Sequence, residues 1–215
     1  TSLASQVHTN AVNWVNWTSN TITGTETIGG INGAIGTVKG TIDLGNGQSV
    51  GVTYTGEYQF AQTDGATTGT PPGYPYGGTE HYYYTGTNVY TSASVANAPP
   101  DSDIIALNFA TQTRTLTFSE PVENLYFAVV SMNNNGYVFD QDFQVASYGP
   151  GYWGNGTLTR VDNHNGTYTV SGTGEPHGVL SIAGSVGKLT WTSAATEFWN
   201  GFTVGTYGKA LTGTA

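Results

Sequence analysis

The sequence predicts an all-β fold, an antiparallel jelly-roll-like β-sandwich that forms a single domain over residues 1–215. Short runs rich in Thr, Val, Ile, Tyr and Phe recur along the chain, and clusters of Gly, Asn, Asp and Pro separate them. No segment keeps apolar residues at helical spacing among good helix formers. The chain is long enough to bury one sizeable core, and its 13% aromatic content supplies apolar area for that core.

The strand pattern of β-branched and aromatic residues recurs in several segments. In chain order, the predicted strands are 37–44, 49–58, 113–119, 125–131, 157–161, 167–171, 178–183, 188–192 and 199–205. Asn46-Gly47 and Asn165-Gly166 each separate two of these strands. We predict a hairpin at both places, because Asn and Gly accept the positive φ that tight turns demand.

Two other segments are predicted not to form strands. Pro99 and Pro100 lack the backbone N–H that a ladder needs, so residues 97–101 are predicted to cross between sheets or to bend the chain. Residues 63–80 form the longest stretch without a strand signal, and loops of this length are usually functional or mobile.

The N-terminal region has four large apolar side chains that would be costly to leave in water: Val12, Trp14, Val15 and Trp17. Residues 1–20 are therefore predicted to form either an edge strand of the chain's own sandwich or a strand given to a neighbouring copy, as in subunits that polymerise.

Charge and composition exclude several classes of partner. The net charge is −9 with only five Lys and Arg residues, so the chain has no basic stripe for nucleic acid. No apolar run approaches the roughly 20 residues that span a bilayer. The absence of Cys argues against a disulfide scaffold. The Thr-, Gly- and Asn-rich composition and the start at Thr1 are typical of a secreted protein whose signal peptide has been removed.

Several motifs follow one another in a characteristic order: "VTYTGEYQFAQT", "NAPPDSDIIAL", "TLTFSEPVENLYFAVVSM", "ASYGPGYWGNGTL", "GEPHGVLSIAG" and "EFWNGFTVG". This combination, over about residues 50–205, resembles secreted bacterial β-sandwich proteins of the kind that carry PEP-CTERM sorting signals. The resemblance implies export to the cell surface or extracellular matrix. The chain ends in "KALTGTA" rather than in the Pro-Glu-Pro box, membrane helix and basic cluster of that signal, so the anchoring route stays open.

The sequence does not favour catalysis. Glycosidases need two carboxylates about 5 to 9 Å apart, and Glu175 beside His177 and Glu197 beside Trp199 are the best pair. The alternative, which we favour, is that Glu175 and His177 bond the backbone of a turn and that Glu197 simply precedes a strand. The chain has no Gly-x-Ser-x-Gly elbow and no zinc-ligand spacing. We therefore expect a protein that is not an enzyme.

Calcium is the one cofactor that the sequence suggests, because carboxylates in loops suit a hard cation. Asp101 and Asp103 follow the two prolines, and Asp140 and Asp142 form a second pair. Alternate spacing directs both carboxylates of a pair to one side of an extended backbone. The alternatives are that Asp101 caps a turn and that Asp140 and Asp142 are solvated.

Aromatic residues in or beside loops suggest a platform on which a sugar could stack. The candidates for ligand contact are Tyr74, Tyr76, Tyr82, Tyr84 and Tyr152. Tyr82, Tyr83, Tyr84 and Tyr90 occupy a strand-like stretch in which alternation would send one set into the core. Trp153 is predicted to be a structural lid of the sandwich.

Together these observations predict a non-catalytic structural protein of a bacterial surface or matrix, which could form filaments by strand exchange with copies of itself. The alternative is a calcium-assisted carbohydrate-binding module whose partner is an extracellular polysaccharide.

Overall fold

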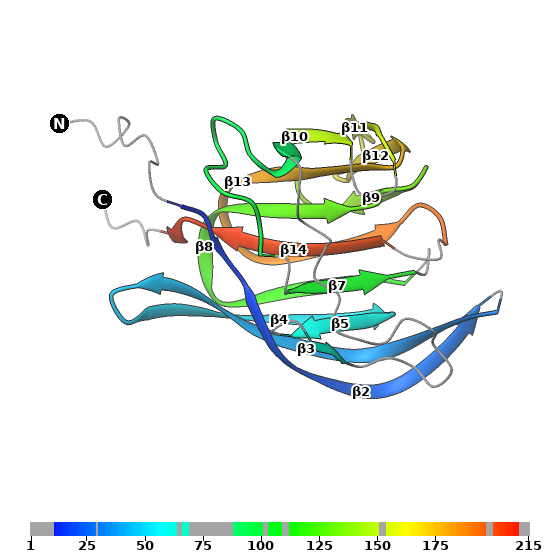
Figure 1. The fold of residues 1–215 in the computed structure, drawn as a ribbon, viewed down its shortest axis with the longest axis horizontal. Coiled ribbons are helices and arrows are strands. Elements are labelled where there is room, and N and C mark those ends of the chain that lie inside the picture. Colours follow the sequence, from blue (N-terminus) through cyan, green and yellow to red (C-terminus); the bar gives the residue numbers. More distant parts are fainter. Residues whose placement is uncertain are drawn as a thin grey trace.

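The computed structural model describes residues 11–28, 30–63, 66–68, 88–100, 103–108, 112–150, 154–196 and 200–210. It confirms the all-β antiparallel prediction, with strands joined edge to edge in an open, sandwich-like network (Figure 1). The strands are β1 (Asn13–Trp14), β2 (Asn16–Ile28), β3 (Ile31–Gly45), β4 (Gln48–Tyr58), β5 (Phe60–Thr63), β6 (Ala66–Thr68), β7 (Ile104–Leu107), β8 (Arg114–Val130), β9 (Gly136–Phe139), β10 (Gln144–Pro150), β11 (Gly156–Asp162), β12 (Tyr168–Gly174), β13 (Pro176–Ser193), β14 (Asn200–Thr206) and β15 (Gly208–Lys209). In these residues the one helical element is a 3-10 turn, η2 (Asn88–Tyr90), and no helix is long and apolar enough to cross a membrane.

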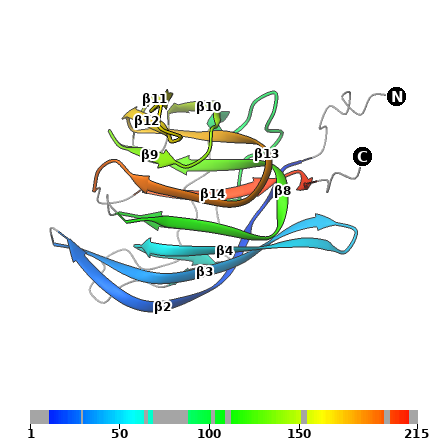
Figure 2. The same ribbon diagram turned by 180° about the vertical axis from the view of Figure 1, so that it is seen from behind.

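Two long strands, β8 and β13, bend and belong to both layers of the fold (Figures 1 and 2). Their first-layer halves continue β2-β3-β4 on one side and β9-β12-β11 on the other. Their second-layer halves lie between β10 and β14, and β14 continues to β7, β5 and β6. Register shifts on β13 between Ile182 and Ser185, and between Val186 and Lys188, mark the bend.

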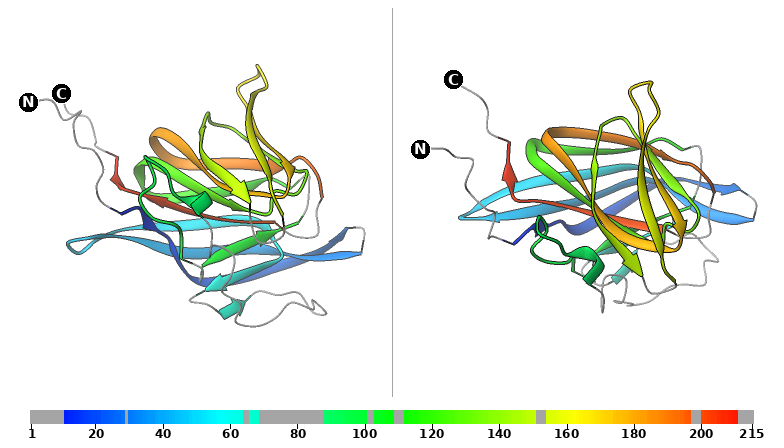
Figure 3. Two further views of the ribbon diagram at one scale, coloured as in Figure 1. Left: turned by 45° about the horizontal axis from the view of Figure 1, so that its top comes forward. Right: turned by 90° about the horizontal axis from the view of Figure 1, so that it is seen from above.

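Alternating side chains on β8 divide the interior into two cores. Phe127 and Val129 point between the layers, where Phe127 stacks on Phe202 of β14 with ring centroids 5.0 Å apart. Ala128 and Val130 point to the opposite face of the second layer and pack in a second cluster. That cluster also contains residues of the segment 88–100, which covers this face (Figure 3).

Two pairs of predicted strands are each one continuous strand. Segments 113–119 and 125–131 belong to β8, and segments 178–183 and 188–192 belong to β13. Pro121 does not end β8, because it lies between the pairs Thr117–Lys188 and Val122–Val186, where β8 has no partner on β13. A missing N–H there removes no ladder hydrogen bond.

Both hairpins are confirmed, but their turns differ. Asn46 and Gly47 have φ of 53° and 74°, the two positive values of a tight two-residue turn. Between β11 and β12 the turn is longer, and the positive φ values fall on His164 and Gly166 rather than on Asn165.

Two further predictions need correction. Ala66–Thr68 forms a strand on β5, within the stretch expected to lack one. Tyr90 lies in η2 rather than in a strand, and its hydroxyl donates to the Val129 carbonyl over 3.0 Å, because burial requires a partner for that hydroxyl.

Candidate functional site

The four apolar residues of the N-terminal region, Val12, Trp14, Val15 and Trp17, lie in the chain's own sandwich. In β1, Trp14 pairs with Gly205 of β14 in the second layer, and at the start of β2, Trp17 pairs with Gly40 of β3 in the first layer. Residues 12–17, which we call the terminal segment, thus pass from one layer to the other. Val12, Val15 and Trp17 are buried and Trp14 is half-buried.

Two glycines make room for the terminal segment. A Cβ atom at position 205 would lie 2.8 Å from Cε3 of Trp14, and one at position 40 would lie 2.9 Å from Cε3 of Trp17. Real Cβ atoms do not approach carbon so closely, so the indole rings lie where only glycine leaves space. Gly205 and Gly40 therefore form surfaces against which the rings of Trp14 and Trp17 pack.

Polar contacts complete this surface. The Val12 N–H donates to Oδ1 of Asn97 over 2.6 Å, and Asn97 Nδ2 donates back to the Val12 carbonyl over 3.1 Å. The Trp14 indole N–H donates to the Asn97 carbonyl over 3.2 Å. The Trp17 backbone N–H donates to Oδ1 of Asp103 over 2.8 Å. The Trp17 indole N–H donates to Oγ1 of Thr203 over 3.3 Å. We call the residues that receive the terminal segment the seat: Gly40, Asn97, Asp103, Thr203 and Gly205.

Asp103, one residue of the predicted calcium pairs, is instead part of the seat. Asp103 is buried, and its carboxylate accepts the backbone N–H of Trp17. Its predicted partner Asp101 lies outside the described residues.

The second predicted pair lies where the chain crosses from β9 to β10. Asp140 Oδ1 accepts the Thr190 N–H over 3.0 Å. Nε and Nη2 of Arg160 donate to the Asp142 carboxylate over 2.6 and 2.9 Å, and the Phe143 N–H donates to Oδ1 of Asp142. These hydrogen bonds, that from Arg160 above all, lower the pKa of Asp142. Both carboxylates are therefore already hydrogen-bonded, and the described residues contain no group of three or more His, Asp or Glu placed to hold a metal ion.

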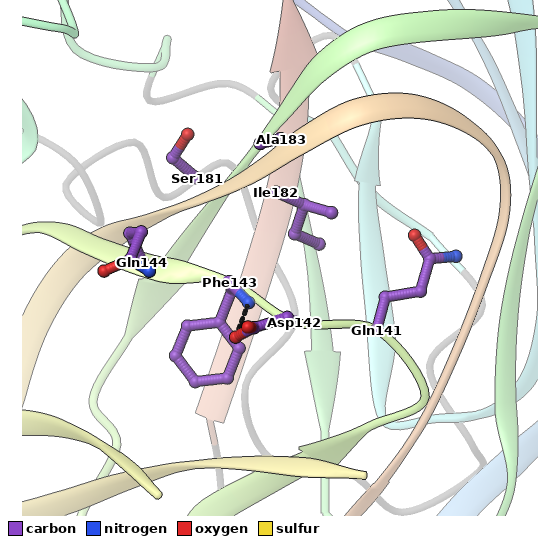
Figure 4. A pocket seen from close by; sticks show the side chains of 7 residues that line it. All are labelled: Gln141, Asp142, Phe143, Gln144, Ser181, Ile182 and Ala183. Carbon is purple, nitrogen blue, oxygen red and sulfur yellow. Dashed lines mark hydrogen bonds between the residues drawn. The ribbon is translucent and has the colours of Figure 1, made fainter. Parts of the chain in front are cut away.

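A shallow depression of about 210 Å³ opens beside Asp142 (Figure 4). It is lined by the segment that connects β9 to β10 and by the adjacent part of β13: Gln141, Asp142, Phe143, Gln144, Ser181, Ile182 and Ala183. Phe143 and Ile182 are buried, whereas Asp142 and Gln144 are exposed. Polar groups thus surround an apolar floor, which suits a small polar ligand such as a single sugar ring.

The predicted aromatic platform is not part of the described structure. Tyr74, Tyr76, Tyr82, Tyr84 and Tyr152 all lie outside the described residues, as does Trp153. The predicted carboxylate pair is incomplete for the same reason, because Glu175 is described and Glu197 is not.

A buried ionic network was not predicted from the sequence. Glu57 of β4 and Arg114 of β8 form an ion pair over 3.0 Å with both side chains fully buried. Glu57 also accepts the N–H of Asn108, and Arg114 donates to Oγ of Ser193 over 2.6 Å. Tyr54 donates to the Glu57 carbonyl, and burial raises the pKa of that phenol well above its ordinary value. The network joins β4 of the first layer to the end of β7 in the second.

His177 is a second buried titratable group, placed in β13 rather than in the predicted turn. Its Nδ1 accepts the N–H of Ser131 over 2.9 Å, and its ring lies 5.9 Å from that of Tyr90. Burial lowers the pKa of His177 to about 4. The imidazole is therefore neutral at pH 7 and serves as an acceptor.

Comparison of the chain with protein-family models, curated proteins and solved structures finds no match. Its function must consequently be inferred from the chain's own geometry, in which the seat is the most extensively built feature.

Proposed function

We propose that this chain is a non-catalytic structural protein of a bacterial cell surface or extracellular matrix, and that it assembles by exchanging the terminal segment between copies. The observation that carries the proposal is the seat. It holds a short N-terminal strand by two glycine surfaces, an Asn97 clamp and the Asp103 carboxylate. None of these contacts depends on which copy supplies the strand.

A terminal segment makes the same contacts in another copy's seat as in its own, so exchange does not lose the free energy of those contacts. A segment that leaves its own seat for an identical seat recovers the same burial of Val12, Val15 and Trp17. The balance between closed and exchanged forms is then set by protein concentration and by the hinge. A hinge is available at Thr18, where the register of β2 on β3 shifts between Trp17 and Ser19. Head-to-tail exchange that does not close produces a filament.

A covalent lock tests the proposal on the full chain. Asn16 and Thr41 are exposed partners on β2 and β3, and the chain has no Cys, so Asn16→Cys with Thr41→Cys can be oxidised without competing thiols. The matched control is Thr37→Cys with Thr55→Cys, partners within the β3–β4 hairpin. Native mass is measured by light scattering over a wide concentration range, before and after oxidation.

Exchange predicts that wild type and the oxidised control grow with concentration into species larger than a dimer, whereas the oxidised lock forms no species larger than a dimer and regains growth on reduction. Wild-type protein that remains monomeric at every concentration would contradict the proposal.

A second candidate function, carbohydrate binding, is favoured by the depression beside Asp142. Exposed Asp and Gln side chains around an apolar floor suit hydroxyl groups and the C–H face of one sugar ring. Retention on insoluble polysaccharide is the test, with calcium and with EDTA as separate arms. Asp142→Ala is expected to abolish retention, and Asp43→Ala, at an exposed position of β3 distant in sequence, is the control. Equal retention of both variants would rule out this site.

A further inference from the structure

The first layer ends in two edge strands, β2 on one side and β11 on the other. Within the described residues, no strand pairs with the outer side of either one. Such an edge presents unpaired N–H and C=O groups that can template another strand. The two edges differ in how well they could do so.

The β2 edge is irregular. Its register on β3 shifts between Trp17 and Ser19 and again between Ile22 and Gly24. The extra residues, Thr18 and Thr23, turn their hydroxyls back to β3, where they donate to the carbonyls of Lys39 and Ile35 over 3.3 and 3.1 Å. Bulges of this kind twist an edge and oppose regular pairing with another chain.

The β11 edge has no such protection. Its seven residues pair with β12 without a shift, from Gly156 opposite Gly174 to Asp162 opposite Tyr168. The strand contains neither Lys nor Pro, and Val161 is 43% exposed. The β11–β12 hairpin also extends beyond the body of the sandwich (Figure 3), where a second molecule could approach it.

We propose that β11 pairs antiparallel with β11 of a second copy of this chain, about a two-fold axis at Thr159. In that register Arg160 faces Leu158, Asp162 faces Gly156, and Val161 faces Thr157 of the other copy. No like charges stand opposite one another, and each Arg160 is already neutralised by its own Asp142. The surface is therefore complementary to itself, as a two-fold contact requires.

The contact is small. Paired seven-residue strands bury less than the roughly 1,200 to 2,000 Å² of a stable interface, so β11 pairing alone gives a weak, concentration-dependent dimer. Copies already linked by strand exchange would present many β11 edges together, and the effective concentration would strengthen lateral pairing. The β11 contact uses none of the seat residues.

The test is made in the oxidised Asn16→Cys/Thr41→Cys chain, in which exchange is blocked. Sedimentation is expected to show a monomer–dimer equilibrium at high concentration. Thr159→Lys places like charges opposite each other at the two-fold axis, and Thr159→Glu does the same with the other sign. Each substitution is expected to raise the dimer dissociation constant by about tenfold or more, and an equimolar mixture of the two is expected to restore the dimer.

The control is Ile22→Lys on the β2 edge, a site with the same 43% exposure as Val161, and it is expected to leave the dimer unchanged. A dimer that survives Thr159→Lys, or a mixture that stays monomeric, would overturn the β11 contact. A locked chain that is monomeric at all concentrations would overturn it as well, while growth of the unlocked chain would leave strand exchange standing. Dimerisation of the locked chain without growth of the unlocked one beyond a dimer would support the β11 contact and contradict strand exchange.

Discussion

Two arginine–carboxylate pairs hold different parts of this molecule, and they contrast sharply. Arg114 and Glu57 meet over 3.0 Å with both side chains fully buried between the layers. Arg160 and Asp142 meet over 2.6 Å at the surface, with 31% and 50% of the side chains exposed. The Arg160–Asp142 pair, which has the shorter distance, is therefore the one exposed to solvent.

The difference shows that distance alone does not measure the importance of an ion pair. At the surface, water replaces a lost partner, and exposed pairs contribute little to stability. In the interior a charge left without its partner is costly, although the intact pair gains little over apolar residues of the same shape. An arrangement of the layers that separates Arg114 from Glu57 is therefore penalised.

The largest effect is expected from Arg114→Met. The substitution leaves the Glu57 carboxylate buried without its cation, and a broken buried pair costs about 3–5 kcal/mol. Denaturant-induced unfolding should show this loss as a lower midpoint with little change in slope.

Glu57→Leu combined with Arg114→Met provides the control, because it removes both charges. The double variant should be more stable than Arg114→Met alone. A double variant that is less stable by the sum of the two single losses would mean that the groups do not act as a pair.

An intermediate effect is expected at His177, which avoids the cost of burial by staying neutral. Its pKa is about 4 in the folded chain and about 6.5 in an unfolded one, so the unfolded state binds the extra proton between these values. Stability should fall as the pH drops from about 6.5 toward 4, by about 3 kcal/mol in total.

In His177→Asn a side-chain oxygen can accept the Ser131 N–H in place of Nδ1, and this pH dependence should disappear. Unfolding midpoints measured from pH 7 to pH 4 provide the comparison. Parallel curves for wild type and variant would show that another group is responsible.

The smallest effect on stability is expected from Arg160→Met. Asp142 is exposed enough for water to replace the guanidinium, so the unfolding midpoint should barely move. The pKa of Asp142, which Arg160 lowers, should rise toward its ordinary value in an NMR titration. A large loss of stability would show that the surface pair resembles the buried one after all.

The sequence was sufficient to predict the fold class, because alternation and turn residues act over short distances. Asn46-Gly47 shows this well, since both residues have the positive φ that the hairpin requires. Continuity of β8 was not predictable, because Pro121 is tolerated only where the register between β8 and β13 shifts and the residues of β8 have no partner on β13.

The sites were harder to predict, because their residues are distant in sequence. Glu57 and Arg114 are separated by more than fifty positions, and nothing local marks them as partners. Val12, Trp14, Val15 and Trp17 were recognised as needing burial. Gly40 and Gly205 became part of a site only when the pairing placed them opposite the two tryptophans.

Whether the terminal segment passes between copies can be measured directly by mixing two single-cysteine chains. One chain carries Asn16→Cys and the other, distinguished by a tag, carries Thr41→Cys; these positions meet only where a terminal segment is seated. Strand exchange predicts a disulfide between the two chains after mixing at high concentration and oxidation, and none in a matched mixture of Thr37→Cys and Thr55→Cys chains. Failure of the first mixture to form the mixed disulfide, while the double variant closes within one chain, would contradict exchange and leave the terminal segment as an edge strand of its own sandwich.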